Sequence, residues 1–307
     1  MSTDLSEISV MVPVYQCAER LPEHLDFLAT ISRRVHELIW VITDSPDGSC
    51  RMAKAAASKL GGKILEVPRG LYEAWNTGIK VAAGEFLYVS TVGDFIEKND
   101  GLDILLGLLQ KTGADLVISP PRPYPHNTVS RKIDRHWPLF TFRKHLEAYD
   151  GLIISRKVTA LIQILSGASG LAGSCASCLF RTRILKDFPF PTDYFHYGDT
   201  AWLYKNIPKI SIALCQSYLA RFNVHASGKS RPVSKKQIYQ LASTLLDFLD
   251  PSARKLAMDF VLASQRIDAI RDPHPKYGWW FIPKAWQVRA QRESCRRQIV
   301  KLIKTKS

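Results

Sequence analysis

The sequence contains no run of about 18 apolar residues, so nothing in it predicts a helix that spans a membrane. Its first ten residues, MSTDLSEISV, lack a basic region followed by an apolar core, so we expect no signal peptide. Six cysteines occur without the spacing of a disulfide framework, which predicts reduced thiols and a cytoplasmic location. Acids are scarce, with 28 Asp and Glu against 42 Lys and Arg. The net charge of +14 predicts an anionic partner, namely nucleic acid, anionic lipid or a phosphorylated substrate.

Apolar runs alternate with amphipathic stretches through the first 120 residues. The runs predict buried strands, and the stretches between them have the spacing of helices with one buried face, as at Leu71, Trp75 and Ile79. Strands that alternate with helices indicate βαβ units, and therefore an α/β fold with a mostly parallel sheet flanked by helices. The expected strands are residues 8–14, 38–43, 63–67, 86–89 and 115–119.

Polar residues stand where three of these strands end. Pro13 and Tyr15 close the first strand, Asp44 follows the second and Asp94 follows the fourth. Ligands of open α/β sheets bind beyond the carboxyl ends of the strands, so these positions predict a ligand site. An aspartate at such a junction is also a common helix N-cap, so the prediction depends on the set of residues and not on any single one.

Two glycine-rich nucleotide motifs are missing from the chain. The first strand is followed by YQCAER, without the G-x-G-x-x-G of dinucleotide-binding folds, and no G-x-x-x-x-G-K-[ST] phosphate loop occurs. The remaining interpretation is a fold that holds a nucleotide diphosphate with carboxylates and a divalent cation. Mg²⁺ and Mn²⁺ prefer oxygen ligands and commonly bridge a carboxylate to substrate phosphates.

Several short motifs follow one another between residues 7 and 231. They are PVYQ at 13–16, TDSPDGS at 43–49, GLYEAWNTGI at 70–79, AGEF at 83–86, VGD at 92–94, HYGD at 196–199 and RFNVH at 221–225. In this order and spacing they resemble an inverting family 2 glycosyltransferase, whose GT-A fold is Rossmann-like. No Q-x-x-R-W motif is present, which argues against a processive synthase of that family.

The resemblance implies a reaction and a set of site residues. A single sugar would pass with inversion from a nucleotide sugar, in the first place a UDP-sugar, to a glycan or lipid-linked acceptor, as in polysaccharide or lipopolysaccharide biosynthesis. A divalent cation, Mg²⁺ or Mn²⁺, would be held by Asp94 and His225, and Asp199 would be the catalytic base. The residues implied to bind the donor are Pro13, Tyr15, Asp44, Glu73, Asn76, Asp94 and His225.

Three positions in the motifs are neutral where the family commonly has an acid, namely Thr43, Gly93 and Gly198. These departures leave three outcomes open: weak metal affinity, an unusual donor or lost activity. Cys175 and Cys178 have the spacing of half a zinc site, but no second pair lies nearby, so we expect buried thiols.

The motifs and a change in composition together predict the domain organisation. Residues 1–231 are the expected GT-A domain, with a nucleotide-sugar half at about 7–120 and an acceptor half at about 121–231. Residues 232–307 are expected to form a helical, basic C-terminal extension.

The end of the chain predicts contact with a membrane surface. Residues 271–307 contain ten Lys or Arg and two acids, and Trp279, Trp280 and Trp286 precede a basic helical pattern. Aromatic residues beside basic ones suit the interface of an anionic bilayer, so we expect peripheral binding at the cytosolic face. The alternatives are a catalytically weak GT-A-like module that binds glycolipid and a basic nucleic-acid-binding protein. No nucleic-acid motif is present, so nucleic acid is not the expected partner.

Overall fold

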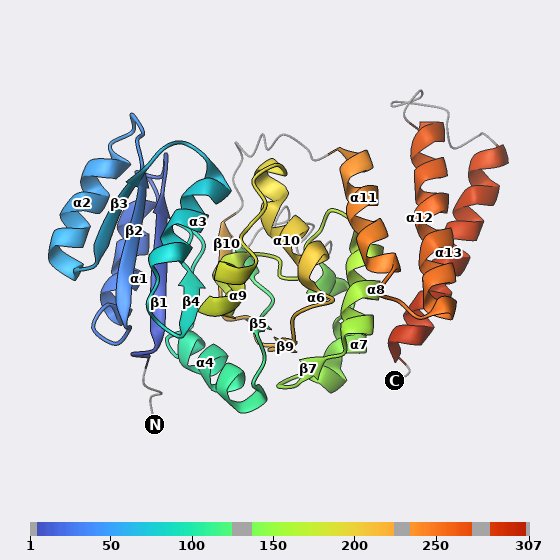
Figure 1. The fold of residues 1–307 in the computed structure, drawn as a ribbon, viewed down its shortest axis with the longest axis horizontal. Helices are drawn as coiled ribbons and strands as arrows, with labels where there is room; N and C mark the ends of the chain where they lie inside the picture. Colours follow the sequence, from blue (N-terminus) through green and yellow to red (C-terminus); the bar gives the residue numbers. More distant parts are fainter. Residues whose placement is uncertain (1–4, 125–136, 224–233, 272–282, 305–307) are drawn as a thin grey trace.

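The computed structural model describes residues 5–124, 137–223, 234–271 and 283–304, and its centre is an eight-stranded sheet (Figure 1). The strands are β1 (Ile8–Val14), β2 (Glu37–Thr43), β3 (Lys63–Val67), β4 (Phe86–Val89), β5 (Leu116–Ile118), β7 (Ile153–Ile154), β8 (Cys178–Arg181) and β9 (Ile212–Leu214). Their order is β3-β2-β1-β4-β8-β5-β9-β7. Pairs that involve β8 or β7 are antiparallel, and all other neighbours are parallel. The predicted α/β fold with a mostly parallel sheet is confirmed.

Helices cover both faces of the sheet in its N-terminal half. These helices are α1 (Leu21–Ile31), α2 (Ser49–Leu60), α3 (Leu71–Val81) and α4 (Gly101–Thr112). Successive side chains of a strand point to opposite faces, so Val10 and Val12 enter one core with α1, α2 and α4, while Met11 enters another core with α3. Because both faces are covered, β1, β2 and β4 are apolar along most of their length, whereas the edge strand β3 keeps the polar residues Lys63 and Glu66.

Shorter elements build the half that follows β5. They are β6 (Arg122–Tyr124), α6 (Pro138–Thr141), α7 (Arg143–Leu146), η1 (Glu147–Tyr149), α8 (Arg156–Ser166), η2 (Cys175–Ser177), α9 (Thr182–Asp187), η3 (Phe195–Tyr197), α10 (Gly198–Asn206) and β10 (Arg221–Asn223). β6 and β10 form a separate parallel pair. Because β8 runs against its neighbours, its first residues and the preceding η2 lie at the carboxyl ends of β4 and β5.

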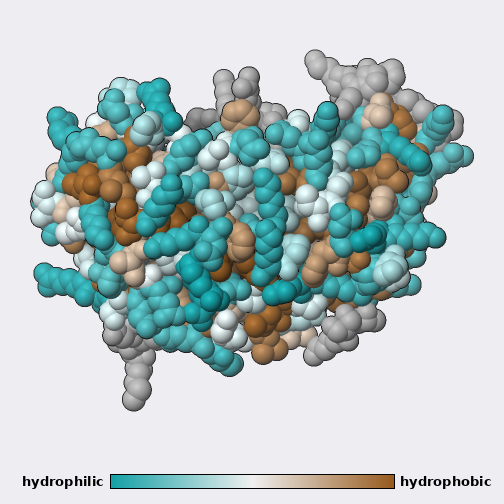
Figure 2. Space-filling view, viewed as in Figure 1, coloured by the Kyte–Doolittle hydropathy of each residue, from teal (hydrophilic) through white to brown (hydrophobic). Residues whose placement is uncertain are grey.

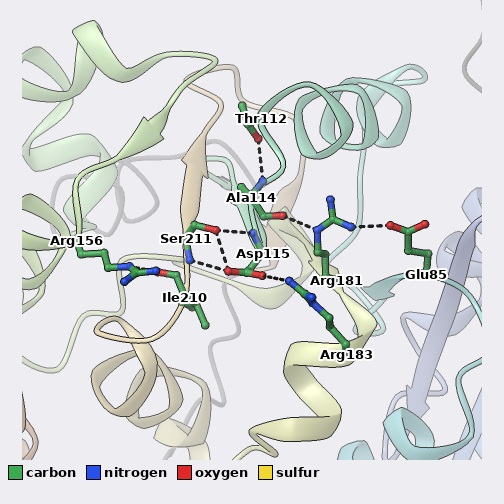
Figure 3. Close-up of polar contacts among 9 residues, drawn as sticks. All are labelled: Glu85, Thr112, Ala114, Asp115, Arg156, Arg181, Arg183, Ile210 and Ser211. Atoms are coloured by element: carbon green, nitrogen blue, oxygen red, sulfur yellow. Dashed lines mark hydrogen bonds and ion pairs between the residues drawn. The ribbon is translucent and has the colours of Figure 1, made fainter.

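A polar network joins the start of β5, the end of β8 and the start of β9 (Figure 3). The carboxylate of Asp115 accepts hydrogen bonds from the N–H of Ser211 at 2.9 Å and from Arg183 at 3.1 Å. Arg181, the last residue of β8, pairs with Glu85 at 2.6 Å. These contacts tie β5, β8 and β9 together at the end of the sheet that lies away from the predicted site.

Three helices follow the α/β part, as the sequence predicts, and lie at the end of the molecule opposite α2 (Figure 1). They are α11 (Lys235–Leu246), α12 (Pro251–Arg271) and α13 (Pro283–Lys304). Ser234 and Gln237 form a capping box that starts α11. α12 packs along α13, while α11 contacts α10 and α13 contacts α8. Within the described residues, no helix is both long and apolar enough to cross a bilayer. The predicted boundary at residues 231 and 232 falls outside them.

Candidate active site

The predicted donor residues at three strand ends lie along one edge of the sheet. β2, β1 and β4 are consecutive parallel neighbours, so their carboxyl ends point the same way. Tyr15 follows β1, Asp44 follows β2, Asp94 lies in the turn after β4, and Pro13 is the last residue but one of β1. Tyr15 and Asp44 are exposed, whereas Pro13 and Asp94 are partly buried.

Asp47 ties the loops after β1 and β2 together. Its carboxylate accepts hydrogen bonds from the backbone N–H of Ala18 at 2.9 Å and from the hydroxyl of Ser49 at 2.7 Å. Removal from water alone would raise its pKa, but these donors outweigh that effect and lower the pKa of Asp47 to about 2. The carboxylate is therefore ionised at neutral pH and fixes the shape of this edge.

Asp94 is held in place by β10, the last strand of the α/β part. Its Oδ1 accepts a hydrogen bond from the backbone N–H of Asn223 at 2.7 Å. Loss of water around the carboxyl raises the pKa of Asp94 to about 7, against the opposing effects of the Asn223 N–H and of the cations of Arg20 and Arg221. A further positive charge would stabilise this carboxylate, because it favours the ionised form.

Arg221 is the buried cation of this region. Its guanidinium pairs with Glu23 of α1 at 2.5 Å and lies over the rings of Phe95 and Tyr124, at 4.1 and 4.8 Å from their centroids. Its backbone N–H donates to the carbonyl of Phe95 at 3.0 Å. Arg221 belongs to the RFNVH motif, and its contacts join β10 to the turn that carries Asp94.

The part of the chain that the structure describes contains no group of three or more His, Cys, Asp or Glu side chains able to hold a metal. Asp94 still fits a site in which the protein gives one carboxylate, and substrate phosphates and water give the other ligands. His225, the second predicted ligand, lies outside the described residues.

Helix α3 carries the other two predicted donor residues. Glu73 is exposed in its first turn. Asn76 uses both ends of its amide on the backbone of Phe190: Nδ2 donates to the carbonyl at 2.8 Å and Oδ1 accepts from the N–H at 3.0 Å. These bonds fix α3 to the segment that follows α9, and a donor contact by Asn76 stays a prediction. Just before the helix, Arg69 lies over the ring of Tyr15 at 5.6 Å.

Asp199 stands in the first turn of α10, where its Oδ1 accepts the N–H of Thr200 at 2.6 Å. Burial raises the pKa of Asp199, while the hydrogen bond from Thr200 and the neighbouring phenol of Tyr72 oppose the shift. The phenol itself donates to the carbonyl of His196 at 3.1 Å. Asp199 borders a small cavity of about 10 Å³ together with Cys175. Cys175 and Cys178 are buried, as predicted, and burial raises the pKa of both thiols. A carboxyl in such neutral surroundings is suited to accept a proton at neutral pH.

Steric crowding explains why two of the motif positions, 93 and 198, carry glycine instead of an acid. A Cβ on Gly198 would lie 2.3 Å from the ring of Tyr72 and 2.7 Å from the carbonyl oxygen of Pro191. Gly93 has a φ of 101°, which favours glycine, and a Cβ there would lie 3.1 Å from the side chain of Arg20. An acid at either position would force its neighbours to move, so both glycines belong to the packing of the site.

A short chain of contacts joins the region of Asp94 to that of Asp199. The hydroxyl of Tyr88 accepts the N–H of Ile96 and donates to the carbonyl of Ala176, each at 3.0 Å. Ala176 lies in η2, whose first residue borders the same cavity as Asp199. Both carboxylates therefore lie at the carboxyl-end edge of one continuous scaffold.

A family model described as glycosyl transferase family 2 matches residues 9–184. The chain belongs to glycosyl transferase family 2. It is therefore a glycosyltransferase, as the motifs predict, and it takes its sugar from a nucleotide-sugar donor. The match runs from β1 to α9 and includes Tyr15, Asp44 and Asp94, whereas Asp199 lies beyond it.

Two crystal structures of S. aureus TarS resemble this glycosyltransferase. TarS 1-349 in complex with UDP-GlcNAc aligns over 96% of this chain and 90% of its own, with 16% identity and a TM-score of 0.62. A second TarS structure aligns over 96% of this chain but 55% of its own, with 15% identity and a TM-score of 0.59. At these identities the likeness shows the GT-A fold alone. No curated protein sequence matches the chain.

Asp47, Arg69 and Tyr72 lie beside predicted residues of the candidate site, although no pattern in the sequence assigns them a role. Asp47 and Tyr72 lie inside two of the family motifs, and that position alone was a signal that they belong near the site. Arg69 lies just outside a motif, and only the packing of two loops brings it to Tyr15.

Proposed function

We propose that this glycosyltransferase moves one sugar with inversion from a UDP-sugar to a hydroxyl of a glycan or lipid-linked acceptor. The observation that carries the proposal is the contrast between two carboxylates at the same edge of the sheet. Asp94 lies near two arginines, a setting that suits an anionic diphosphate. Asp199 lies among neutral groups that suit a proton acceptor. The two side chains would thus divide donor binding and acceptor activation between them.

The donor would lie across the ends of β1, β2 and β4. In this proposal Tyr15 and Asp44 contact the base and ribose, with Pro13, Glu73 and Asn76 beside them. Tyr15 and Asp44 are exposed and accessible to such a ligand. The related fold of TarS, whose structure contains UDP-GlcNAc, supports this class of donor.

Asp94 would hold Mg²⁺ or Mn²⁺ against the donor diphosphate, with His225 as a second ligand. When bound, such a cation stabilises the negative charge that develops on the diphosphate leaving group. The Asn223 N–H fixes one oxygen of Asp94 in place. Arg20 and Arg221 add fixed positive charge near the same carboxylate.

Asp199 would act as the general base. Its carboxylate would take the proton of the acceptor hydroxyl while that oxygen bonds to the anomeric carbon and the bond from that carbon to the UDP oxygen breaks. Attack on the face opposite the leaving group inverts the anomeric centre. The N–H of Thr200 would orient the carboxylate for this step, with the phenol of Tyr72 beside it.

A panel of nucleotide sugars, each with Mn²⁺ and with EDTA, tests this proposal. We expect at least one UDP-sugar to raise the Tm and to be hydrolysed slowly, and both effects to require the cation. Glycolipid binding without turnover of any donor would favour the alternative of a binding module. If no nucleotide sugar changes the Tm while oligonucleotides bind in a salt-sensitive way, the transferase proposal is wrong for this chain.

Helix α13 would place the enzyme on an anionic membrane surface. Its residues include seven Lys or Arg and one Glu, and Trp286 is 62% exposed. Apolar side chains also show among hydrophilic ones at the α12–α13 end of the molecule (Figure 2). Most of the predicted aromatic cluster lies outside the described residues. Each cation near an anionic surface contributes roughly 1 kcal/mol, and less at high salt.

Vesicle co-sedimentation tests this membrane proposal. Ile299 and Ile303 of α13 are buried, so deleting the helix would damage the core, and substitutions at exposed residues are the sharper test. The parent should pellet with anionic vesicles and remain in solution with neutral ones. The triple variant Lys284→Glu, Arg297→Glu, Lys301→Glu should remain in solution with both, and pelleting equal to the parent would contradict the proposal.

A further inference from the structure

A second cavity, of about 390 Å³, lies between the α/β part and the C-terminal helices. α8 and α10 form one side of it, and α11, α12 and α13 form the other. A cavity of this size can take a small molecule or one end of a larger one. The family motifs assign nothing to it, although Tyr197 of the HYGD motif lines it.

The cavity lies beside the region of Asp199. Tyr197 precedes Asp199 by two residues, and Tyr204 of the same helix, α10, forms part of the wall. Residues 166–168 line this cavity, and Gly170 borders the small cavity at Asp199. One loop, residues 166–170, and one helix, α10, therefore border both spaces.

The floor of the cavity is apolar and aromatic. Leu165 of α8 and Val261 and Phe260 of α12 contribute side chains to it. The hydroxyl of Tyr204 already donates to two backbone carbonyls at the end of α8, at 2.9 and 3.0 Å, so this residue offers mainly its ring. Such a surface binds apolar chains or the apolar faces of sugar rings.

The rim of the cavity carries an excess of positive charge. Lys235 and Arg271 both pair with Asp268, at 3.2 and 2.9 Å. Arg292 lies over the ring of Phe260 at 5.3 Å, and within the described ranges it makes no ion pair and no hydrogen bond. The cavity wall therefore holds two cations, Lys235 and Arg292, and one carboxylate, Asp268, and the guanidinium of Arg292 has its donors available for an anion.

An apolar floor below a cationic rim fits a ligand that joins a phosphate to an apolar or sugar portion. We propose that this cavity binds the phosphate-bearing part of the acceptor, with Arg292 as the phosphate ligand, and so presents the acceptor hydroxyl to Asp199. The inference rests on the proposed transferase function and adds the chemical class of the acceptor, a phosphate ester. Arginine suits this role because its planar fork of donors matches phosphate oxygens.

Farnesyl phosphate, farnesol and glucose 1-phosphate are suitable probes, because they separate the apolar chain from the phosphate. In calorimetric titrations of the full chain, we expect farnesyl phosphate to bind and farnesol to bind more weakly. Arg292→Gln should weaken phosphate binding about tenfold or more, since a charge-assisted hydrogen bond is lost. Arg266→Gln removes the same charge from an exposed position of α12 outside the cavity lining and should leave the affinity within about twofold.

The two phosphate probes also distinguish the possible sources of the acceptor. Tighter binding of farnesyl phosphate than of glucose 1-phosphate supports a lipid-linked acceptor, and equal binding supports a water-soluble one. Ser264→Leu fills the cavity without changing its charge and should also weaken farnesyl phosphate binding, with the Tm close to that of the parent.

Two results would overturn the inference: equal affinities of parent and Arg292→Gln for the phosphate probes, or no binding of either probe. Donor stabilisation by UDP-sugars, measured on the same proteins, keeps this result apart from the proposed function. If donors still raise the Tm while phosphates do not bind, the acceptor inference fails and the transferase proposal stands.

Discussion

Asp94 and Asp199 both lose water on folding and both have a raised pKa, but their neighbours differ. Asp94 has the cation of Arg221 close by and a backbone N–H on one oxygen. Asp199 has neutral neighbours, among them the phenol of Tyr72 and the thiol of Cys175. Burial alone therefore does not assign a role. A cationic environment suits binding of a diphosphate, and a neutral one suits proton transfer.

The largest effect is expected on the acceptor side. Asp199→Asn keeps the shape of the side chain but removes the base, so turnover with an acceptor should fall about 100-fold or more. The measurement is the initial rate of UDP release in the presence of acceptor, at saturating donor. A rate close to that of the parent would place the base elsewhere, and the exposed Asp193 would then be tested.

Gly198→Ala tests whether close packing requires glycine at the position before Asp199. The added methyl would meet the ring of Tyr72 and the carbonyl of Pro191, so we expect a loss of about 1–3 kcal/mol in the free energy of unfolding. Gly107 in α4 is the matched control, because a Cβ there meets nothing within 4 Å. Gly107→Ala should stabilise the protein by about 0.5–1 kcal/mol. Equal unfolding free energies for the two variants in urea would contradict the packing explanation.

A buried histidine on the donor side makes stability depend on pH. Burial, with the charge of Arg221, lowers the pKa of His24 from 6.5 to about 3. The unfolded chain binds this proton more readily, so the stability is fully present above pH 6.5 and is lost as the pH falls from 6.5 towards 3.

At pH 5 this effect should reduce the free energy of unfolding by about 2 kcal/mol relative to pH 7. Urea denaturation at both pH values measures it. The raised pKa of Asp94 adds stability as the pH falls through the same range, so the effect of His24 is the difference between the parent and His24→Gln. That difference should change between the two pH values, whereas His36→Gln, at an exposed position, should follow the parent. The same pH dependence in the parent and in His24→Gln would contradict the assigned pKa of His24.

Tyr72→Phe should give the smallest effect and sharpen the description of Asp199. The phenol of Tyr72 donates to the carbonyl of His196 at 3.1 Å and, lying beside Asp199, opposes the rise in the pKa of that carboxyl, so its loss should raise the pKa of Asp199 further. The acidic limb of the kcat/KM profile should then move to higher pH, by about one unit or less. Tyr204→Phe removes a hydroxyl from α10 that bonds to α8 instead, and it should leave the profile in place. A profile unchanged in Tyr72→Phe would remove this tyrosine from the proposed mechanism.

The N-terminal half could be predicted from the sequence because its elements are encoded locally. Each apolar run is long enough to read as a strand, and the five expected strands agree with the structure to within one residue at each end. The edge that carries Tyr15, Asp44 and Asp94 was predictable as well, because parallel βαβ units place all three strand ends together.

The second half could not be derived in the same way. β7, β8 and β9 are two to four residues long, and β5 pairs with β9 across about 95 residues of sequence. The hydrogen bonds of Asn76 to the backbone of Phe190 and the contact of Arg69 with Tyr15 also depend on packing between distant segments. No local pattern contains that information, so the surroundings of Asp199 became visible only in the folded chain.

The most direct test of the division of roles is the affinity for UDP with Mn²⁺ in the parent, Asp94→Asn and Asp199→Asn, measured by calorimetry with an EDTA control. We expect Asp94→Asn to lose the metal-dependent part of the affinity, about tenfold or more, because the carboxylate that would hold the cation is gone. Asp199→Asn should bind UDP within about twofold of the parent. Equal metal-dependent affinities in the parent and Asp94→Asn, or an equal loss in both variants, would contradict the assignment of the two carboxylates.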